Sequence, residues 1–262
     1  MKFQIWREVL GPYKVAVEEL VIKLQHIRAE YQDRGMYSPI EYVQGRVKSV
    51  TSLLEKAERK SIAVEDITDK IDDIAGIRVV CQFVEDIDHV VELISKRSDI
   101  QILEQNDYIR NVKESGYRSY HLVVSYGVNT IDSLQTVKVE IQIRTLAMNF
   151  WAVIEHSLQY KYRDMPEHIS KRLTASANAI LLLDNEMSSI REEVMVAQRV
   201  FRQRSNVVDD ILNTIQNLYK VLPSFEISEL QQEFYKLYHN GEPKTLIAFS
   251  RRLEKLAKDN GI

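Results

Sequence analysis

Three cations and a hydroxyl group recur at helical spacing in the stretch GRVKSVTSLLEKAERK, residues 45–60. At 100° per residue, the side chains of Lys48, Ser52, Lys56 and Arg59 fall within an arc of about 80°, nearly opposite the apolar residues. Most amphipathic helices have a charged face in water, and such a face would explain the row without any function. Several positive donors in one row could also follow the successive phosphoryl groups of a triphosphate. Periodicity alone leaves both interpretations open.

Carboxylates and arginines share the polar side of two alternating stretches, TVKVEIQIR and GIRVVCQFV. Arg78, Glu140 and Arg144 alternate with apolar residues, as in a strand with one polar face, and Asp73 comes just before the second stretch. An antiparallel sheet with one face in water gives the same pattern. If helices cover that face, the residues line a cleft in which carboxylates bind Mg²⁺ and guanidinium groups bind phosphates.

The stretch KESGYRSYHL, residues 113–122, combines charges and aromatic rings that a plain turn does not need. Gly116 would let the backbone approach a ligand, and Tyr117 offers a platform for a nucleobase. His121 begins the strand that follows.

A second histidine lies on the helix predicted for TLAMNFWAVIEHSLQYKY. Asn149, Ala152 and His156 are spaced i, i+3, i+7 and share one face of that helix, on which the alanine leaves room. A lone histidine on a helix is more often a satisfied core residue, and Phe150 and Trp151 are more typical of packing. Only the convergence of these features with the preceding ones argues for a site.

The overall composition is that of an ordinary soluble globular protein, with 262 residues, 45% hydrophobic and 28% charged. No apolar run approaches the roughly 20 residues that span a bilayer, and the N-terminus lacks a signal-peptide pattern, so we expect a cytoplasmic protein. The single cysteine, Cys81, excludes an intrachain disulfide and a multi-cysteine metal site. With a net charge of −3, anion binding must come from local clusters.

The elements that must position these residues form an α+β pattern. A long helix is predicted over residues 5–32, and a second helix over residues 43–60 follows the break at Ser38-Pro39. Further predicted elements are a short helical piece (64–71), strands at 76–84, 100–105, 120–126 and 136–144, a helix at 86–97, and helices from residue 145 onward. The last region is interrupted at Met165-Pro166, Leu222-Pro223 and Asn240-Gly241. We expect a small mixed, mostly antiparallel sheet flanked by helices, with a helical C-terminal part.

The four stretches GRVKSVTSLLEKAERK, DDIAGIRVVCQF, KESGYRSYHL and VEIQIRTLAMNFWAVIEHSLQYKY together resemble the synthetase domain of the RelA/SpoT family, most closely the RelQ-type small alarmone synthetases. The likeness extends from Trp6 to about Arg202. It implies a nucleotidyltransferase-like synthetase fold and a GTP pyrophosphokinase of the stringent response, which transfers the pyrophosphate of ATP to the 3′-hydroxyl of GTP or GDP.

The resemblance also implies a role for each candidate residue. Arg46 and Arg78 would sandwich adenine, a stacking role that suits a planar guanidinium. Lys48, Ser52, Lys56 and Arg59 would hold the ATP phosphates. Asp73 and Glu140 would bind Mg²⁺, with Glu140 also the base for the attacking hydroxyl.

Tyr117 would stack on guanine. The rest of the guanosine-nucleotide pocket would be Lys113, Ser115, Gly116, His121, Gln142, Arg144, Asn149 and His156.

The resemblance sets expectations for domains and regulation as well. Residues 1–205 would form the synthetase domain and residues 206–262 a helical extension of unassigned role, which could extend a subunit interface. No His-Asp dipeptide occurs, so synthesis without hydrolysis is expected. RelQ-type enzymes form homotetramers whose central cleft binds the alarmone pppGpp as an activator. Here Val21 and Gln25 stand where lysines are expected, and Tyr42 and Gln44 also depart from the pattern, which predicts weak activation.

Two other functions fit parts of the pattern. An RNA-binding regulator could stack single-stranded RNA on tyrosines interleaved with cations, but the net acidity counts against this as the main role. Another Mg²⁺-dependent nucleotidyltransferase would use similar carboxylates and release pyrophosphate rather than AMP.

Overall fold

A computed structural model describes residues 6–161, 166–240 and 243–260 of the chain. The chain divides into two compact units, Met1–Ser188 and Ser189–Ile262, and each is described by itself. The boundary between them falls inside one long helix. The division into a synthetase domain, 1–205, and an extension, 206–262, remains a prediction about function.

The first unit is built on a five-stranded sheet of order β1-β2-β5-β4-β3. Of its four strand pairs, β2 with β5 is parallel and the other three are antiparallel. The strands are β1 (Tyr42–Val47), β2 (Ala75–Cys81), β3 (Ile100–Asp107), β4 (Tyr120–Asn129) and β5 (Leu134–Thr145). The predicted α+β class with a mixed, mostly antiparallel sheet is confirmed.

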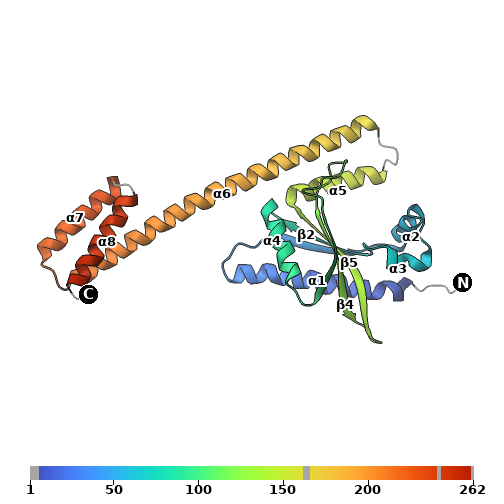
Figure 1. The fold of residues 1–262 in the computed structure, drawn as a ribbon, viewed down its shortest axis with the longest axis horizontal. Helices are drawn as coiled ribbons and strands as arrows, with labels where there is room; N and C mark the ends of the chain where they lie inside the picture. The colour runs from blue at the N-terminus through green and yellow to red at the C-terminus, as the bar shows by residue number, and fades with distance from the viewer. Residues whose placement is uncertain (1–5, 162–165, 241–242, 261–262) are drawn as a thin grey trace. The chain divides into compact units, whose positions relative to one another are not determined.

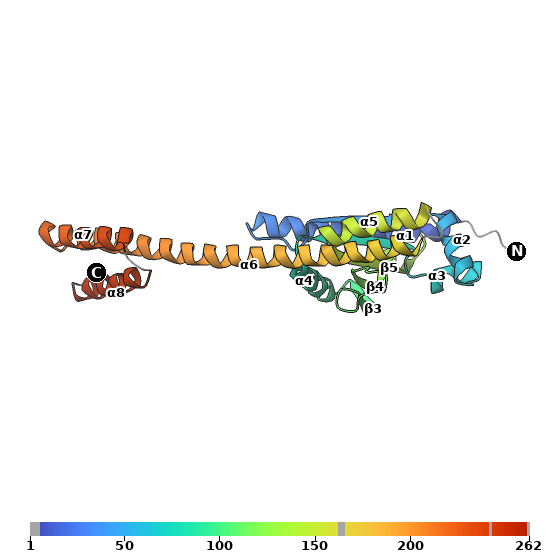
Figure 2. The ribbon, with the colours of Figure 1, turned by 90° about the horizontal axis from the view of Figure 1, so that it is seen from above.

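Helices surround this sheet (Figures 1 and 2). They are α1 (Trp6–Asp33), α2 (Val50–Arg59), the 3₁₀ turn η1 (Val64–Asp66), α3 (Ile67–Lys70), α4 (Val84–Ser95), α5 (Leu146–Lys161) and the first part of α6 (Glu167–Leu218). Both views show α5 beside the first part of α6, and Trp151 and Ala152 of α5 form a small apolar cluster there with Ala177 of α6.

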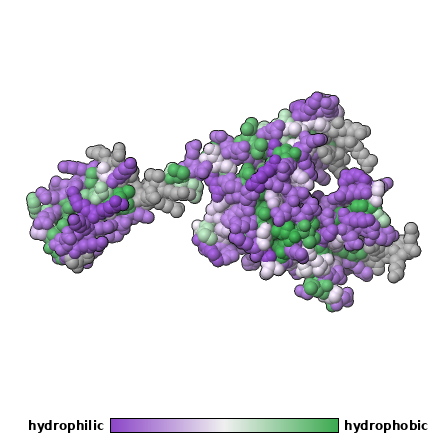
Figure 3. Space-filling model, viewed as in Figure 1, coloured by the Kyte–Doolittle hydropathy of each residue, from purple (hydrophilic) through white to green (hydrophobic). Residues whose placement is uncertain are grey.

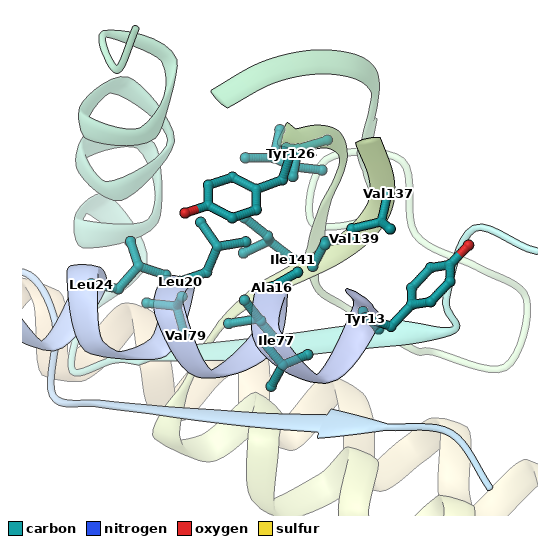
Figure 4. Close-up of a cluster of buried hydrophobic side chains, with 14 of the residues drawn as sticks. Tyr13, Ala16, Leu20, Leu24, Ile77, Val79, Tyr126, Val137, Val139 and Ile141 are labelled. Atoms are coloured by element: carbon teal, nitrogen blue, oxygen red, sulfur yellow. The ribbon is translucent and has the colours of Figure 1, made fainter. Parts of the chain in front are cut away.

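The main core lies between α1 and the sheet (Figure 4). Leu20 of α1 is fully buried, as are Ile77 of β2 and Ile141 of β5, and the close-up shows them gathered on one side of the strands. Because side chains alternate along a strand, Arg78 and Glu140, which neighbour Ile77 and Ile141, face the opposite side of the sheet. Burial of the apolar face thus fixes which side of the sheet carries the charges.

The predicted helix over residues 43–60 is wrong in its first part, where the chain forms strand β1. Val43 and Val47 are four residues apart, a spacing that places two side chains on one face of a helix and also on one face of a strand. Pairing with β2 decides the outcome, with Gly45 opposite Ile77. A side chain at Gly45 would lie within 2.5–2.7 Å of the methyl groups of Val17 and Val21, so glycine allows the strand to pack closely against α1.

The second unit consists of the end of α6, α7 (Ser224–Asn240) and α8 (Pro243–Asp259) around a separate apolar core. Ile211, Leu218 and Leu253 are fully buried in it. The predicted break at Leu222-Pro223 is confirmed by the end of α6 at Leu218, and α7 ends at Asn240; Met165 and Gly241 lie outside the described residues.

Hydrophilic side chains cover most of the visible face of the chain (Figure 3). Among the described helices, none combines the length and the apolar character needed to cross a membrane.

Candidate active site

Two lysines of the predicted cationic row converge on one carboxylate oxygen. The Nζ atoms of Lys48 and Lys56 lie 2.6 Å and 2.7 Å from Oδ2 of Asp73, and each of the three side chains is about one-fifth exposed, 18%, 19% and 21%. Burial opposes ionisation of Asp73, but the two ammonium groups outweigh it and hold its pKa below the ordinary value. Burial lowers the pKa of Lys48, against the attraction of Asp73. The site is therefore a compact cationic cluster with one internal counter-charge.

The local sequence explains how the two lysines reach Asp73. Ser49, the residue directly after Lys48, is the N-cap of α2 and accepts a hydrogen bond from the backbone N–H of Ser52 at 3.2 Å. Lys56 follows two turns later on the face toward Asp73. Ser52 lies in the first turn of α2 and Arg59 in its last turn, and both are exposed. The row is thus partly helix and partly the segment that leads into it.

A cavity of about 170 Å³ opens on the polar side of the sheet. Strand β1, the start of β2 and the middle of β5 supply its walls. The lining residues are Gln44, Gly45, Arg46, Lys48, Asp73, Gly76, Ile77, Arg78, Glu140 and Gln142. The structure therefore brings six of the predicted site residues around one hollow: Arg46, Lys48, Asp73, Arg78, Glu140 and Gln142.

Glu140 is the centre of a hydrogen-bonded network on this face. Its Oε1 lies 3.1 Å from Nδ1 of His121, and its Oε2 accepts a 2.6 Å hydrogen bond from Nε2 of Gln142. Burial opposes ionisation of Glu140, but these two partners outweigh it and lower its pKa. The carboxylate is thus held ionised, the form that can take a proton from a hydroxyl group.

The network continues to the tyrosine of the predicted loop. Nε2 of His121 lies 2.9 Å from the Tyr117 hydroxyl, which also accepts a 3.0 Å hydrogen bond from Nη2 of Arg144. Arg144 donates to Gln142 as well. A continuous chain of hydrogen-bonded side chains therefore joins the loop to Glu140.

The backbone of the loop lies close to helix α6 at Gly116. Gly116 has a φ of 86°, a left-handed conformation that favours glycine, and an added Cβ would lie 2.7 Å from Cβ of Ala177 on α6. The space that this glycine leaves on its Cβ side is therefore taken up by a helix, and its approach to a ligand remains a prediction. Ser115 and Lys113 are exposed, and Nζ of Lys113 lies 5.2 Å from the centre of the Tyr117 ring.

The two predicted residues of α5 lie beside the cavity-lining strands. Nδ2 of Asn149 donates a 2.9 Å hydrogen bond to the hydroxyl of Tyr42 on β1. His156 is exposed, and its pKa is lowered by partial burial and by the positive charges of Arg46, Lys48 and Arg78. The sequence analysis assigns these three cations to ATP. His156, which it assigns to the guanosine nucleotide, therefore lies in the electrostatic field of the predicted ATP-binding residues.

Two residues that the sequence analysis did not select belong to the same surroundings. The ring of Tyr108 meets His121 edge-on with centroids 5.1 Å apart, and Nζ of Lys113 lies 4.0 Å from its centre. Arg118 is buried beneath the loop. The position of Arg118 inside KESGYRSYHL could have identified it as a candidate from sequence. Tyr108 lies outside that stretch, and no sequence pattern indicates its role.

The residues present could bind a divalent cation whose coordination shell is completed by the phosphates of the substrate. Oδ1 of Asp73 is buried and has no hydrogen-bond partner, while Oδ2 takes both lysines. Within the described parts of the chain, no group of three or more histidine, cysteine, aspartate or glutamate side chains could hold a metal by itself. Mg²⁺ is commonly bound by one or two carboxylates together with substrate phosphates, so Asp73 and Glu140 fit that mode.

Residues that depart from the expected pattern also have defined places. Val21 packs against β1 at Gly45, and Gln25 is exposed on α1. Tyr42 is bonded to Asn149, and Gln44 lines the cavity.

Known proteins are similar to this chain in sequence and in fold. Residues 45–165 match a family model described as "Region found in RelA / SpoT proteins". The chain is 54% identical over 200 residues to the GTP pyrophosphokinase YjbM of Bacillus subtilis, covering 76% of this chain and 94% of that protein.

Two solved structures of the small alarmone synthetase 1 from Bacillus subtilis are also similar. The one bound to its product pppGpp has a TM-score of 0.70 at 54% identity and covers 72% of this chain and 98% of the other. The one bound to AMPCPP has a TM-score of 0.64 at 50% identity, with 72% and 97% covered.

Proposed function

The chain belongs to the RelA/SpoT family, and we propose that it is a small alarmone synthetase: it transfers the pyrophosphate of ATP to the 3′-hydroxyl of GTP or GDP and releases AMP. The observation that carries the proposal is the single hollow lined by Lys48, Asp73 and Glu140. Around this hollow lie a lysine of the cationic cluster, a carboxylate oxygen of Asp73 without a hydrogen-bond partner and an ionised glutamate, which supports the proposed reaction.

The positively charged residues around the hollow are the proposed binding site of ATP, the pyrophosphate donor. Lys48 and Lys56 would bind the ATP phosphates, with Ser52 in the first turn of α2 and Arg59 at its far end. Their ammonium groups already share one carboxylate, so an incoming triphosphate meets cations held in place rather than free in water. Arg46 and Arg78 line the same hollow and would hold adenine between their guanidinium planes.

The hydrogen-bonded residues around Tyr117 are the proposed binding site of GTP or GDP, the pyrophosphate acceptor. Tyr117 would stack on guanine, while Arg144 and His121 fix its hydroxyl and so its ring. The pocket would be completed by Lys113, Ser115, Gly116, Gln142, Asn149 and His156. Of these, His156 is affected by the positive charges of the residues proposed to bind ATP.

Glu140 is proposed as the base for the attacking hydroxyl. His121 and Gln142 hold its carboxylate ionised at neutral pH, and it lies on the strand that runs between the donor and acceptor residues. Asp73 and Glu140 would hold Mg²⁺, which neutralises phosphate charge when it is bound. Catalysis would then rest on positioning and electrostatics.

Product analysis tests this function. The purified protein is incubated with ATP, MgCl₂ and either GTP or GDP, and the nucleotides are separated by anion exchange. The proposal requires AMP in a one-to-one ratio with a guanosine carrying five or four phosphates. Release of pyrophosphate with an adenylylated product would instead indicate a nucleotidyltransferase. Incubation with the purified product checks the expected lack of hydrolysis.

The proposal extends to assembly and location. We propose a homotetramer that acts in the cytoplasm, with pppGpp a weak activator because Val21 and Gln25 replace expected cations; single-stranded RNA remains a candidate ligand. Light scattering gives the subunit number, and titration of pppGpp into the assay gives the activation.

A further inference from the structure

Helix α6 contacts the predicted guanosine loop, residues 113–119, at several points. Arg118 makes the central contact. Its Nη1 donates to the backbone oxygens of Gly116 at 3.2 Å and Ala177 at 3.1 Å, and its Nη2 donates to Oδ1 of Asn178 at 3.1 Å. One guanidinium group therefore joins the loop backbone to two consecutive residues of the helix.

Two further contacts join the same partners. The hydroxyl of Thr174 donates to the backbone oxygen of Ser115 at 3.3 Å, although it also lies 3.2 Å from the Ser170 oxygen of its own helix. Gly116 lies so close to Ala177 that a Cβ at position 116 would be 2.7 Å from the alanine methyl. Polar and apolar contacts thus fix the same short stretch of loop.

Farther along, α6 is tied to the strand that carries the site. The Thr145 hydroxyl, at the end of β5, donates to Oδ2 of Asp184 at 2.8 Å and accepts from the backbone N–H of Met148 at 3.0 Å. Thr145 and Asp184 are both buried, 0% and 4% exposed. The helix therefore holds both the loop and the strand end next to Arg144.

These contacts bear on the acceptor pocket because Tyr117 lies between two anchored residues. Gly116 and Arg118 flank it in sequence; Arg118 is hydrogen-bonded to α6 and Gly116 packs against Ala177, while the Tyr117 hydroxyl is bound to Arg144 and His121. The backbone beside Tyr117 and the tip of its side chain are thus fixed by separate partners, which holds the ring in one orientation.

We propose that Arg118 and Asn178 are positioning residues for the guanosine nucleotide: by fixing loop 113–119 to α6, they hold Tyr117 ready to stack on the base. This inference rests on the proposed function. It assigns a role to residues 174–184, which lie beyond the segment 45–165 that matches the family model.

The test uses the full-length protein with three substitutions on the exposed side of the contact. Asn178→Ala removes one acceptor of Arg118 without touching the core, and Asn178→Asp retains an acceptor there. Asn185→Ala is the matched control, because Asn185 is exposed on the same helix two turns farther on. Steady-state kinetics with each nucleotide and amide hydrogen exchange of residues 113–119 are measured for all three.

For Asn178→Ala we expect the KM for GTP or GDP to rise about three- to tenfold, on the scale of losing one ordinary intramolecular hydrogen bond, with the KM for ATP unchanged. Amide exchange in the loop should become faster. Asn178→Asp and Asn185→Ala should both stay close to wild type.

An unchanged guanosine KM together with unchanged loop exchange in Asn178→Ala would overturn the inference. Equal effects on the two nucleotides would also contradict it, because they indicate a general structural role. A wild-type protein that makes no product would refute the proposed function alone, and the exchange measurement would still decide whether Asn178 fixes the loop.

Discussion

Asparagine in place of Asp73 would remove one negative charge from the cationic cluster while keeping the shape of the side chain. Lys48 and Lys56 both bind Oδ2 of Asp73, so the substitution leaves two ammonium groups facing a neutral amide. A hydrogen bond to a charged group contributes about 1.5–3 kcal/mol, and partial exposure lowers that value. We expect the free energy of unfolding to fall by about 1–3 kcal/mol.

The same change should strengthen the binding of ATP without metal. Asp73 repels the triphosphate and competes with it for the two lysines. Two unit charges 4 Å apart interact by about 4 kcal/mol at an effective dielectric constant of about 20. Even a third of that amount would tighten binding about tenfold. With Mg²⁺ present, turnover should instead fall sharply, because the substitution removes a carboxylate assigned to the ion.

Calorimetric titration with ATP in EDTA and in MgCl₂, combined with turnover measurements, separates the two effects. Asp72→Asn is the matched control, since Asp72 is the adjacent residue, is 41% exposed and pairs with Lys138 at 2.9 Å outside the cavity. An Asp73→Asn protein with wild-type turnover, or with weaker binding of metal-free ATP, would refute the reasoning. So would a control that behaves in the same way.

Three other substitutions test other parts of the site. Glu140→Gln should lower kcat at least about 100-fold at neutral pH, the scale of general-base catalysis, and in the wild type the acid loss of kcat should begin only below the ordinary glutamate pKa of 4.5. Tyr117→Ala should raise the KM for the guanosine nucleotide about 5- to 150-fold and leave that for ATP unchanged, since a base stack contributes about 1–3 kcal/mol. Burial raises the pKa of Asp184 to about 6, against the opposing effects of Thr145 and Arg118, so the folded state loses stability as the pH rises from 3.8 through 6. Thermal melts should therefore show that Asp184→Asn raises the Tm more at pH 8 than at pH 4.

The sequence was most informative where one pattern allowed one structure. Strict alternation in TVKVEIQIR predicts a strand with Glu140, Gln142 and Arg144 on one face, and β5 has that face. Sequence patterns also identified Lys48 and Asp73 as candidates in two separate groups, and the structure joins these two residues in one ion pair. The predicted helix over 43–60 failed because valines four residues apart fit both periods, and only the pairing of β1 with β2 decides between them.

The contacts around the loop could not be predicted from sequence. Arg118 and Ala177 are 59 residues apart, and a backbone oxygen of a helix has no signature in the residue types. The space around Gly116 likewise depends on α6, so its use for helix packing becomes evident only in three dimensions. Local patterns identify the side chains that could do chemistry, and the fold decides what holds them.

The account is tested most directly by the crystal structure of Glu140→Gln with AMPCPP, Mg²⁺ and GTP bound together. It predicts the triphosphate on Lys48 and Lys56, the guanine on the ring of Tyr117, and the 3′-hydroxyl next to residue 140 and in line with the β-phosphorus. Nucleotides bound elsewhere, or a guanine away from Tyr117 with its 3′-hydroxyl turned from the triphosphate, would contradict it.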